Sequence, residues 1–247
     1  MPINVLPYFL GAFLWVLLCG RFSITVSPTA LKKRFKAELD KPLQPRYNAA
    51  PGQKLPVILN RSPNKILLCR WGFIPHWAKD ASMDYRLINA RAETIMENRI
   101  YRSAFRKRRC LVLADGFYEW QKTPMRKIPH RIVLQDGSPF AFAGIWSGQK
   151  NKNKHWINSF SIITTKANSL VAEIHDRMPV ILQPQDETNW LNMPPEEAVN
   201  LLQPYSANLM QAYPVSSRVN STTNDDPELI KPITLKKKHV KRLDDYF

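Results

Sequence analysis

Short apolar stretches separated by turn-forming residues recur along this chain, and they limit the folds that are open to it. Their length and their content of β-branched and aromatic residues predict strands rather than helices. The predicted strands cover residues 55–59, 66–71, 110–114, 117–122, 130–135, 140–146, 160–165, 178–183 and 210–215. Because helices do not alternate with these strands, we expect an α+β fold. It would be a single domain built on a curled, mostly antiparallel β-sheet or barrel-like core with short flanking helices.

Short helices and tight turns are expected between the strands. Ser27 is a typical N-cap residue in front of Pro28, and an apolar stripe follows at four-residue spacing, formed by Leu31, Phe35 and Leu39. Further helical segments are predicted over residues 167–174, 187–190 and 195–203. Two Asp-Gly pairs are typical of tight turns, at residues 115–116 and 136–137.

The charge of the chain points to a polyanionic partner. Its 247 residues include 36 Lys and Arg against 20 Asp and Glu, a net charge of +16, which favours nucleic acid or an anionic membrane surface. Hydrophobic residues make up 44% of the chain, enough for one sizeable core. Three widely separated cysteines, with no CxxC pattern or nearby His, predict neither a disulfide framework nor a metal site: Cys19, Cys69 and Cys110.

The two ends of the chain differ in composition from the part between them. Residues 2–18 carry no charge, and their apolar run has the character of a signal peptide or a short membrane span. A basic segment in front and small residues at a cleavage position are missing. We therefore expect residues 1–18 to be an apolar extension outside the mature protein, which would begin at Cys19 through a downstream start or through processing. Residues 19–235 form the predicted domain, and residues 236–247 a basic tail that orders only on a polyanion.

Cys19 has a distinctive chemistry if it becomes the first residue of the chain. Its thiol and its free α-amine would then lie two carbons apart. The amine condenses with an aldehyde to an imine, the thiolate attacks that imine, and a five-membered thiazolidine closes with the advantage of an intramolecular reaction. An N-terminal Cys19 would therefore trap aldehydes, whereas a cysteine inside a chain is usually a small buried hydrophobic residue.

Six separated segments of the chain form an ordered set of motifs. They are CGRF from Cys19, residues 46–53, WGFIPHWA from Trp71, NARAET from Asn89, ADGFYEW from Ala114 and IHDRMP from Ile174. In these motifs and their order, the chain from Cys19 to about residue 233 resembles the SOS response-associated peptidase family, abasic-site processing proteins that crosslink to DNA. It departs from the family pattern at one point. The family's cysteine directly follows an initiator methionine that is removed, whereas residues 1–18 precede Cys19 here.

The resemblance implies covalent capture of an abasic site in single-stranded DNA, because an abasic deoxyribose opens to an aldehyde. Cys19 would supply both nucleophiles, and Glu119 would be the general acid and base that helps to open the sugar. His175 would orient the sugar and handle protons in the reverse reaction, and Asn89 would hold the reacting centre by hydrogen bonds. A self-processing peptidase activity would expose the Cys19 amine.

The resemblance also implies contacts to DNA. Arg21 and Arg91 would clamp the phosphates that flank the lesion. Trp71, Phe73 and Trp77 offer aromatic surfaces for stacking on unpaired bases or for wedging against a duplex end, although Trp71 and Phe73 could equally belong to the core. We expect a monomer that needs no cofactor and no membrane, and that works in the cytoplasm, associated with the nucleoid when bound to DNA.

Two other functions fit parts of the sequence. One is a thiol peptidase that acts on other proteins, with Cys19 as nucleophile and His175 as base, although peptidase chemistry alone does not explain a charge of +16. The other is a membrane-anchored protein, with residues 1–18 as the anchor and a basic surface facing acidic lipid. A DNA adduct that resists denaturation would separate the first from abasic-site capture, and cell fractionation would separate the second.

Overall fold

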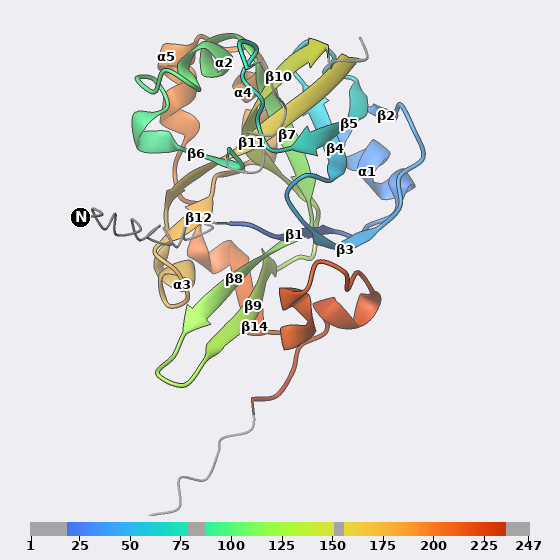
Figure 1. The fold of residues 1–247 in the computed structure, drawn as a ribbon, viewed down its shortest axis with the longest axis vertical. Coiled ribbons are helices and arrows are strands. Elements are labelled where there is room, and N and C mark those ends of the chain that lie inside the picture. Colours follow the sequence, from blue (N-terminus) through green and yellow to red (C-terminus); the bar gives the residue numbers. More distant parts are fainter. Residues whose placement is uncertain (1–18, 79–86, 151–155, 236–247) are drawn as a thin grey trace, which may run out of the picture.

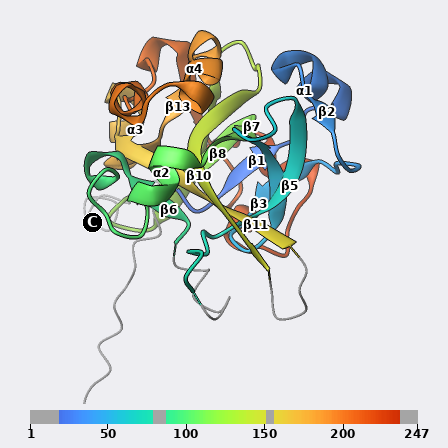
Figure 2. The ribbon, with the colours of Figure 1, turned by 90° about the horizontal axis from the view of Figure 1, so that it is seen from above.

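In the computed structural model, which describes residues 19–78, 87–150 and 156–235, five strands close into a barrel (Figure 1, Figure 2). They are β4 (Lys54–Leu59), β5 (Lys65–Trp71), β7 (Arg109–Ala114), β10 (Phe140–Lys150) and β11 (Trp156–Lys166). Antiparallel ladders join them in the order β11-β10-β7-β4-β5, and a parallel pairing of β5 with β11 closes the ring. The predicted α+β class with a mostly antiparallel, barrel-like core is confirmed.

A second sheet of five strands packs against the barrel. Its order is β14 (Met210–Pro214), β9 (Lys127–Leu134), β8 (Gly116–Lys122), β1 (Phe22–Ile24) and β3 (Arg46–Ala49), and all of its pairings are antiparallel. Only Asp115 separates β7 of the barrel from β8. Aromatic side chains fill the space between the sheets, because the Phe22 ring lies 5.0 Å from Trp71 and 5.8 Å from Phe142, measured between centroids. The second sheet is thus anchored to the barrel through β1.

Short strands extend the barrel wall. They are β2 (Glu38–Leu39), β6 (Asn89–Arg91), β12 (Arg177–Pro179) and β13 (Ile181–Leu182). β6 runs parallel to β11 and β12 runs antiparallel to it, so that Thr164 of β11 is paired with both Arg91 and Pro179. β11 therefore brings β6 and β12, which are distant in sequence, to the same residue from its two sides.

Helices cover the outside of the sheets. They are α1 (Pro28–Phe35), α2 (Arg102–Lys107), α3 (Ser169–Ala172), α4 (Glu187–Asn192) and α5 (Pro195–Ala198). The predicted cap of α1 is confirmed, because the Ser27 hydroxyl accepts a 3.2 Å hydrogen bond from the amide of Ala30. The predicted stripe is wrong at its end. Lys36 adopts a left-handed conformation with φ of 49°, which stops the helix and leaves Leu39 in β2.

The predicted strands are present in the structure. The two Asp-Gly pairs, both predicted as tight turns, differ in their conformation. Asp136-Gly137 forms the expected turn, with Gly137 at φ of 68°. The turn predicted at Asp115-Gly116 is wrong, because Gly116 begins β8 and pairs with Ser23. A Cβ atom on Gly116 would lie 2.7 Å from Nε of Arg131, so glycine is needed here for close approach rather than for a turn.

The two chain ends that differ in composition are not part of this description. Residues 1–18 and 236–247, the predicted extension and basic tail, lie outside the described residues. Within the described part of the chain, no helix has the length and apolar character needed to span a bilayer.

Candidate active site

Cys19 lies just before β1, in direct contact with Glu119 of β8. The backbone nitrogen of Cys19 donates a hydrogen bond of 3.0 Å to Oε1 of Glu119, and both residues are buried. Antiparallel pairing continues the contact, since the amide of Tyr118 donates to the Arg21 carbonyl at 3.0 Å and Phe22 pairs with Phe117. Cys19 and Glu119, whose roles the family resemblance implied, are thus joined by a hydrogen bond although they lie 100 positions apart in sequence.

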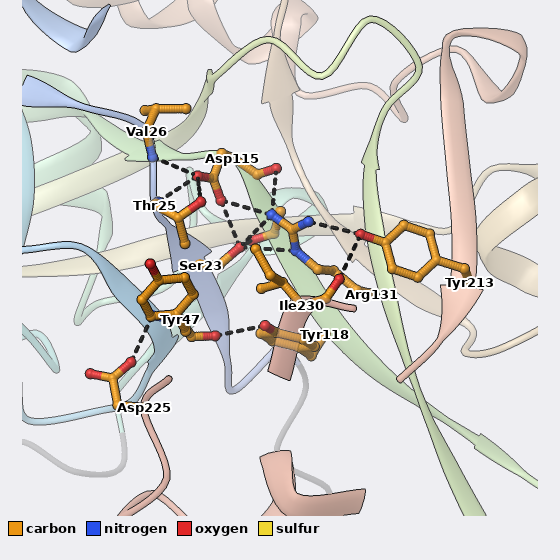
Figure 3. A network of polar contacts seen from close by, with 11 residues as sticks. Ser23, Thr25, Val26, Tyr47, Asp115, Tyr118, Arg131, Tyr213, Asp225 and Ile230 are labelled. Atoms are coloured by element: carbon orange, nitrogen blue, oxygen red, sulfur yellow. Dashed lines mark hydrogen bonds and ion pairs between the residues drawn. The ribbon is translucent and has the colours of Figure 1, made fainter. Parts of the chain in front are cut away.

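A buried polar network fixes β1 against β8 and β9 (Figure 3). The Asp115 carboxylate accepts hydrogen bonds from the Ser23 hydroxyl at 2.7 Å and from the Thr25 amide at 2.5 Å. It also pairs with the Arg131 guanidinium at 3.0 Å, and that guanidinium donates to the Tyr213 hydroxyl at 2.8 Å. Because each buried polar group has a partner, the network holds the strand that follows Cys19 in one position.

Glu119 has the electrostatics of an acid–base group. Burial raises the pKa of its carboxyl group to about 7, although hydrogen bonds from Cys19 act in the opposite direction. The exposed carboxylate of Asp176 adds to the increase. Burial also raises the pKa of the Cys19 thiol well above its ordinary value, and the Glu119 charge adds to this effect. The thiol therefore needs a base, and the adjacent carboxyl group can give or take a proton at neutral pH.

His175 lies at the predicted junction between a helix and a strand, between α3 and β12. Its Nδ1 lies 3.1 Å from the amide nitrogen of Arg177 and 2.9 Å from Oδ1 of Asp176. Burial lowers the pKa of the ring, which favours the neutral form at neutral pH. In the neutral tautomer whose Nδ1 accepts the Arg177 amide, the proton is on Nε2, whereas the tautomer with the proton on Nδ1 would donate to Asp176 instead. His175 can thus offer an Nε2–H donor to a bound oxygen.

Asn89 and Arg91 belong to β6 and reach the site through β11. Asn89 pairs with Ile162 of β11, and its carbonyl accepts a 3.1 Å hydrogen bond from the Tyr101 hydroxyl. Arg91 has an exposed side chain. The structure thus places both residues on the short strand that runs along one side of β11, while β12, which follows His175, runs along the other side.

Arg177 links the two segments, and sequence reasoning did not select it. Its guanidinium makes a bidentate ion pair with Glu93, at 2.7 and 3.0 Å, and also donates to the Thr164 carbonyl at 2.7 Å. The Arg177 charge lowers the pKa of the Cys19 thiol, against the larger effect of burial. Its only sequence signal is its place in the motif that begins at Ile174, next to His175.

A cavity of about 520 Å³ opens beside these groups. Its walls are formed by Arg91 of β6, by Gln121 and Lys122 of β8, and by residues 172–177. Gln121 donates a 3.1 Å hydrogen bond to the Glu173 carbonyl, which ties the β8 wall to the α3 wall. The cavity therefore joins two of the sequence motifs, NARAET and IHDRMP, with the end of β8, and carries both basic and acidic side chains.

Two of the three aromatic residues predicted to stack on bases are in the core, which corrects that prediction. Trp71 is 0% exposed and Phe73 is 1% exposed. Trp71 contacts Phe22 and Phe160, and its indole nitrogen donates to the Ile88 carbonyl at 3.1 Å. Trp77, in contrast, is 56% exposed and is accessible to a ligand.

Arg21 makes hydrogen bonds within the protein, which were not expected from its predicted role as a phosphate clamp. Its Nη1 donates to the side chain of Asn48 at 2.9 Å and to the Val219 carbonyl at 2.8 Å, and its Nη2 donates to the Asn220 carbonyl at 3.2 Å. These bonds hold the segment η6 (Ser217–Asn220) against β1 and β3. Much of the guanidinium is therefore engaged within the protein.

The cysteines outside the site are ordinary core residues. Cys69 and Cys110 are buried and free. In the described part of the chain, no three His, Cys, Asp or Glu side chains lie close enough together to hold a metal ion.

Comparisons with known proteins agree with the arrangement of these motifs. A family model described as SOS response associated peptidase (SRAP) matches residues 18–222. The Abasic site processing protein YoqW of Bacillus subtilis is 43% identical over 222 residues, covering 87% of this chain and 99% of that protein. The Abasic site processing protein YedK of Escherichia coli is 32% identical over 227 residues, covering 87% of this chain and 100% of that protein. A crystal structure of a Bacteroides thetaiotaomicron protein is similar with a TM-score of 0.81 at 28% identity, covering 87% of this chain and 100% of that one. The chain therefore belongs to the SOS response associated peptidase family.

Proposed function

We propose that this protein processes abasic sites in single-stranded DNA by trapping the aldehyde of the opened deoxyribose on Cys19. The names of its relatives, abasic site processing proteins, support the substrate class. The observation that carries the proposal is the 3.0 Å hydrogen bond from the Cys19 nitrogen to Glu119. It puts a carboxyl group with a pKa of about 7 beside the two atoms that would react.

Two bonds to the aldehyde carbon form in the proposed reaction. The Cys19 amine attacks the carbonyl carbon, and the resulting carbinolamine loses water to give an imine, with a proton supplied by Glu119. The Cys19 sulfur then attacks the imine carbon, and its proton passes through the Glu119 carboxylate to the nitrogen. One aldehyde and one N-terminal cysteine give a thiazolidine and one water, without oxidation or reduction.

The other candidate residues have supporting roles in this proposal. His175 directs its Nε2–H at an oxygen of the opened sugar, and Asn89 holds the reacting centre by hydrogen bonds. Arg91 binds a phosphate at the wall of the cavity that it lines. Trp77 stacks on an unpaired base. We assign residues 19–235 to this activity, in a monomer that works in the cytoplasm.

The active form has Cys19 as its first residue, because a peptide nitrogen cannot form an imine. In the full chain this nitrogen is bonded to Leu18, and the Glu119 carboxyl group lies 3.0 Å from it. Water would add to the Leu18 carbonyl carbon, and the same group would protonate the nitrogen as the peptide bond breaks, which gives the Leu18 carboxylate and the free Cys19 amine. We therefore assign peptidase chemistry to the Leu18–Cys19 bond of the chain itself.

The proposal is tested with one form of the protein that begins at Cys19 and one that begins at Leu18. Each is incubated with single-stranded DNA that carries an abasic site, and the products are separated under denaturing conditions. The form that begins at Cys19 should give a lasting adduct. The form that begins at Leu18 should give none, and neither should Cys19→Ser in the shorter form, because an oxygen nucleophile closes a less stable ring. Equal adduct from all three proteins would overturn the proposal.

A further inference from the structure

The hairpin formed by β8 and β9 continues past the cavity and ends in a basic tip, beyond α3 in Figure 1. Lys122 ends β8, Lys127 begins β9, and Arg126 lies in the turn between them; all three side chains are exposed. The chain has no Asp or Glu from Trp120 to Gln135. The charged side chains of the tip are therefore all positive. We name residues 122–127 the basic hairpin.

The cations of the basic hairpin are not used within the protein. Within the described part of the chain, the side chains of Lys122, Arg126 and Lys127 make no hydrogen bond or ion pair, and the contacts of Arg126 with Thr123 run through its backbone. Some basic residues elsewhere are paired, as Arg218 is with Asp226 at 2.7 Å. Unpaired, exposed cations of this kind are available for phosphate groups.

The basic hairpin is continuous with the cavity. Lys122 lines the cavity, and its charge acts on His175, where it helps to lower the pKa of the ring. The cavity is also lined by the acidic residues Glu173 and Asp176. A strand leaving the cavity would be repelled from these carboxylates and attracted to the hairpin. Lys122 lies three residues beyond Glu119 and pairs with Lys127, so at a rise of about 3.3 Å per residue the basic hairpin begins roughly 10 Å along β8 from Glu119.

We propose that the basic hairpin is a second DNA-binding surface, which takes the phosphates of the single strand on one side of the lesion. That the lesion binds in the cavity rests on the proposed function. The attraction of the basic hairpin for phosphates does not depend on it. Affinity should therefore rise with the length of the strand on that side, whether or not the strand carries a lesion.

The test measures binding of the full chain to short single-stranded oligonucleotides that carry a central, non-reactive abasic analogue. The oligonucleotides have an extension of ten thymidines on the 5′ side, on the 3′ side, or on neither. One extension should raise affinity by about tenfold or more in the wild type. In the double variant Arg126→Ala/Lys127→Ala, that gain should disappear, while the short oligonucleotide and the other extension should bind as before. Binding weakens with salt, and the logarithm of the binding constant falls linearly with the logarithm of the salt concentration. Loss of two single-strand phosphate contacts should reduce the magnitude of this slope by about 1.4.

The matched control is Arg102→Ala/Lys107→Ala, which removes the same charge from exposed positions on α2. The two double variants should differ, because only the first removes a directed contact. An equal loss in both, or a gain that survives in the hairpin variant, would overturn the proposal. Lesion-free oligonucleotides with the same extensions keep this result separate from the proposed function. If crosslinking fails while the length-dependent gain persists, the basic hairpin stands and the trapping reaction falls.

Discussion

Glu119 is a single buried carboxyl group whose ionisation affects both reaction and stability. Its pKa of about 7 in the folded protein lies above the ordinary value of 4.5. A group of this kind binds its proton more tightly in the folded state than in the unfolded state. Its contribution to stability is therefore most favourable below pH 4.5, and it is lost progressively as the pH rises through 7.

We predict that Glu119→Gln stabilises the full chain at pH 8 relative to wild type more than it does at pH 5. Glutamine keeps an acceptor for the Cys19 amide and has no charge to desolvate, so the penalty above pH 7 disappears. Denaturant unfolding of both proteins at the two pH values measures the difference. The same difference at pH 5 and pH 8 would show that the carboxyl group ionises as freely in the folded state as in the unfolded one.

In the form that begins at Cys19, Glu119→Gln should slow crosslinking by about 100-fold, because general acid–base catalysis contributes at least that much in many enzymes. Affinity for single-stranded DNA with the non-reactive analogue should stay nearly unchanged. A time course of adduct formation and a binding isotherm give the two numbers. A variant that crosslinks at the wild-type rate would remove Glu119 from the mechanism.

Alanine substitutions of Arg21 and Arg91 should have different effects: the first should lower stability, and the second should weaken DNA binding. Arg21→Ala removes three hydrogen bonds from a half-buried guanidinium and should lower the free energy of unfolding by about 2 kcal/mol. Arg91→Ala changes an exposed side chain and should leave stability within about 0.5 kcal/mol while weakening DNA binding. Unfolding curves and DNA titrations on both variants decide this. A stable Arg21→Ala protein with weak DNA binding would restore the phosphate clamp predicted from the sequence.

The motifs that carry the family resemblance pointed to Cys19 and Glu119, which are in contact, but they left open whether Trp71 and Phe73 face solvent or the core. The chemistry of an N-terminal thiol and a nearby carboxyl group can be read from the residues that carry it. Whether an indole faces solvent depends on partners such as Phe22 and Phe160, which belong to other strands. Sequence spacing does not contain this tertiary information.

At the level of elements, long strands were predictable and the shortest strands were not. The apolar parts of β10 and β11 were predicted, at residues 140–146 and 160–165, although both strands extend further into polar residues, whereas β1 and β6 have three residues each. Three residues show no periodicity, and both strands exist because longer neighbours pair with them. Of the strands that carry candidate site residues, β8 with Glu119 was predicted from the sequence, whereas β6 with Asn89 and Arg91 was not.

Gly116→Ala should destabilise the protein by about 1 to 3 kcal/mol, the usual cost of overpacking a core. The added methyl group would lie within 3 Å of the Arg131 guanidinium and would push it away from Asp115. Gly137→Asn is the control, because that glycine has φ of +68° and open space around it, and asparagine tolerates this conformation. Denaturant unfolding compares the two. Equal stability of both variants would mean that the Asp115 network adapts without cost.

For the whole molecule, the charge of +16 and the exposed Trp77 should act together on strand preference. Single-stranded DNA offers phosphates and base faces, whereas paired bases hide those faces from an aromatic side chain. We predict tighter binding of single-stranded than of duplex DNA, a loss of affinity with added salt, and a smaller preference in Trp77→Ala. A salt series with lesion-free oligonucleotides of both kinds measures this. Equal affinities would leave only electrostatics and exclude stacking.

The closure of the barrel by β5 and β11 has a consequence for how the protein folds. These strands are far apart in sequence, and their parallel pairing must wait until the intervening chain has collapsed, which makes the closure a slow, non-local event. β6 and β12 gain their places only on β11, and the Cys19 contact spans 100 residues. A nascent or partly folded chain therefore carries an ordinary thiol. In the proposed function, reactivity therefore depends on the pairing of β1 with β8 across 100 residues and would report that this part of the fold has formed.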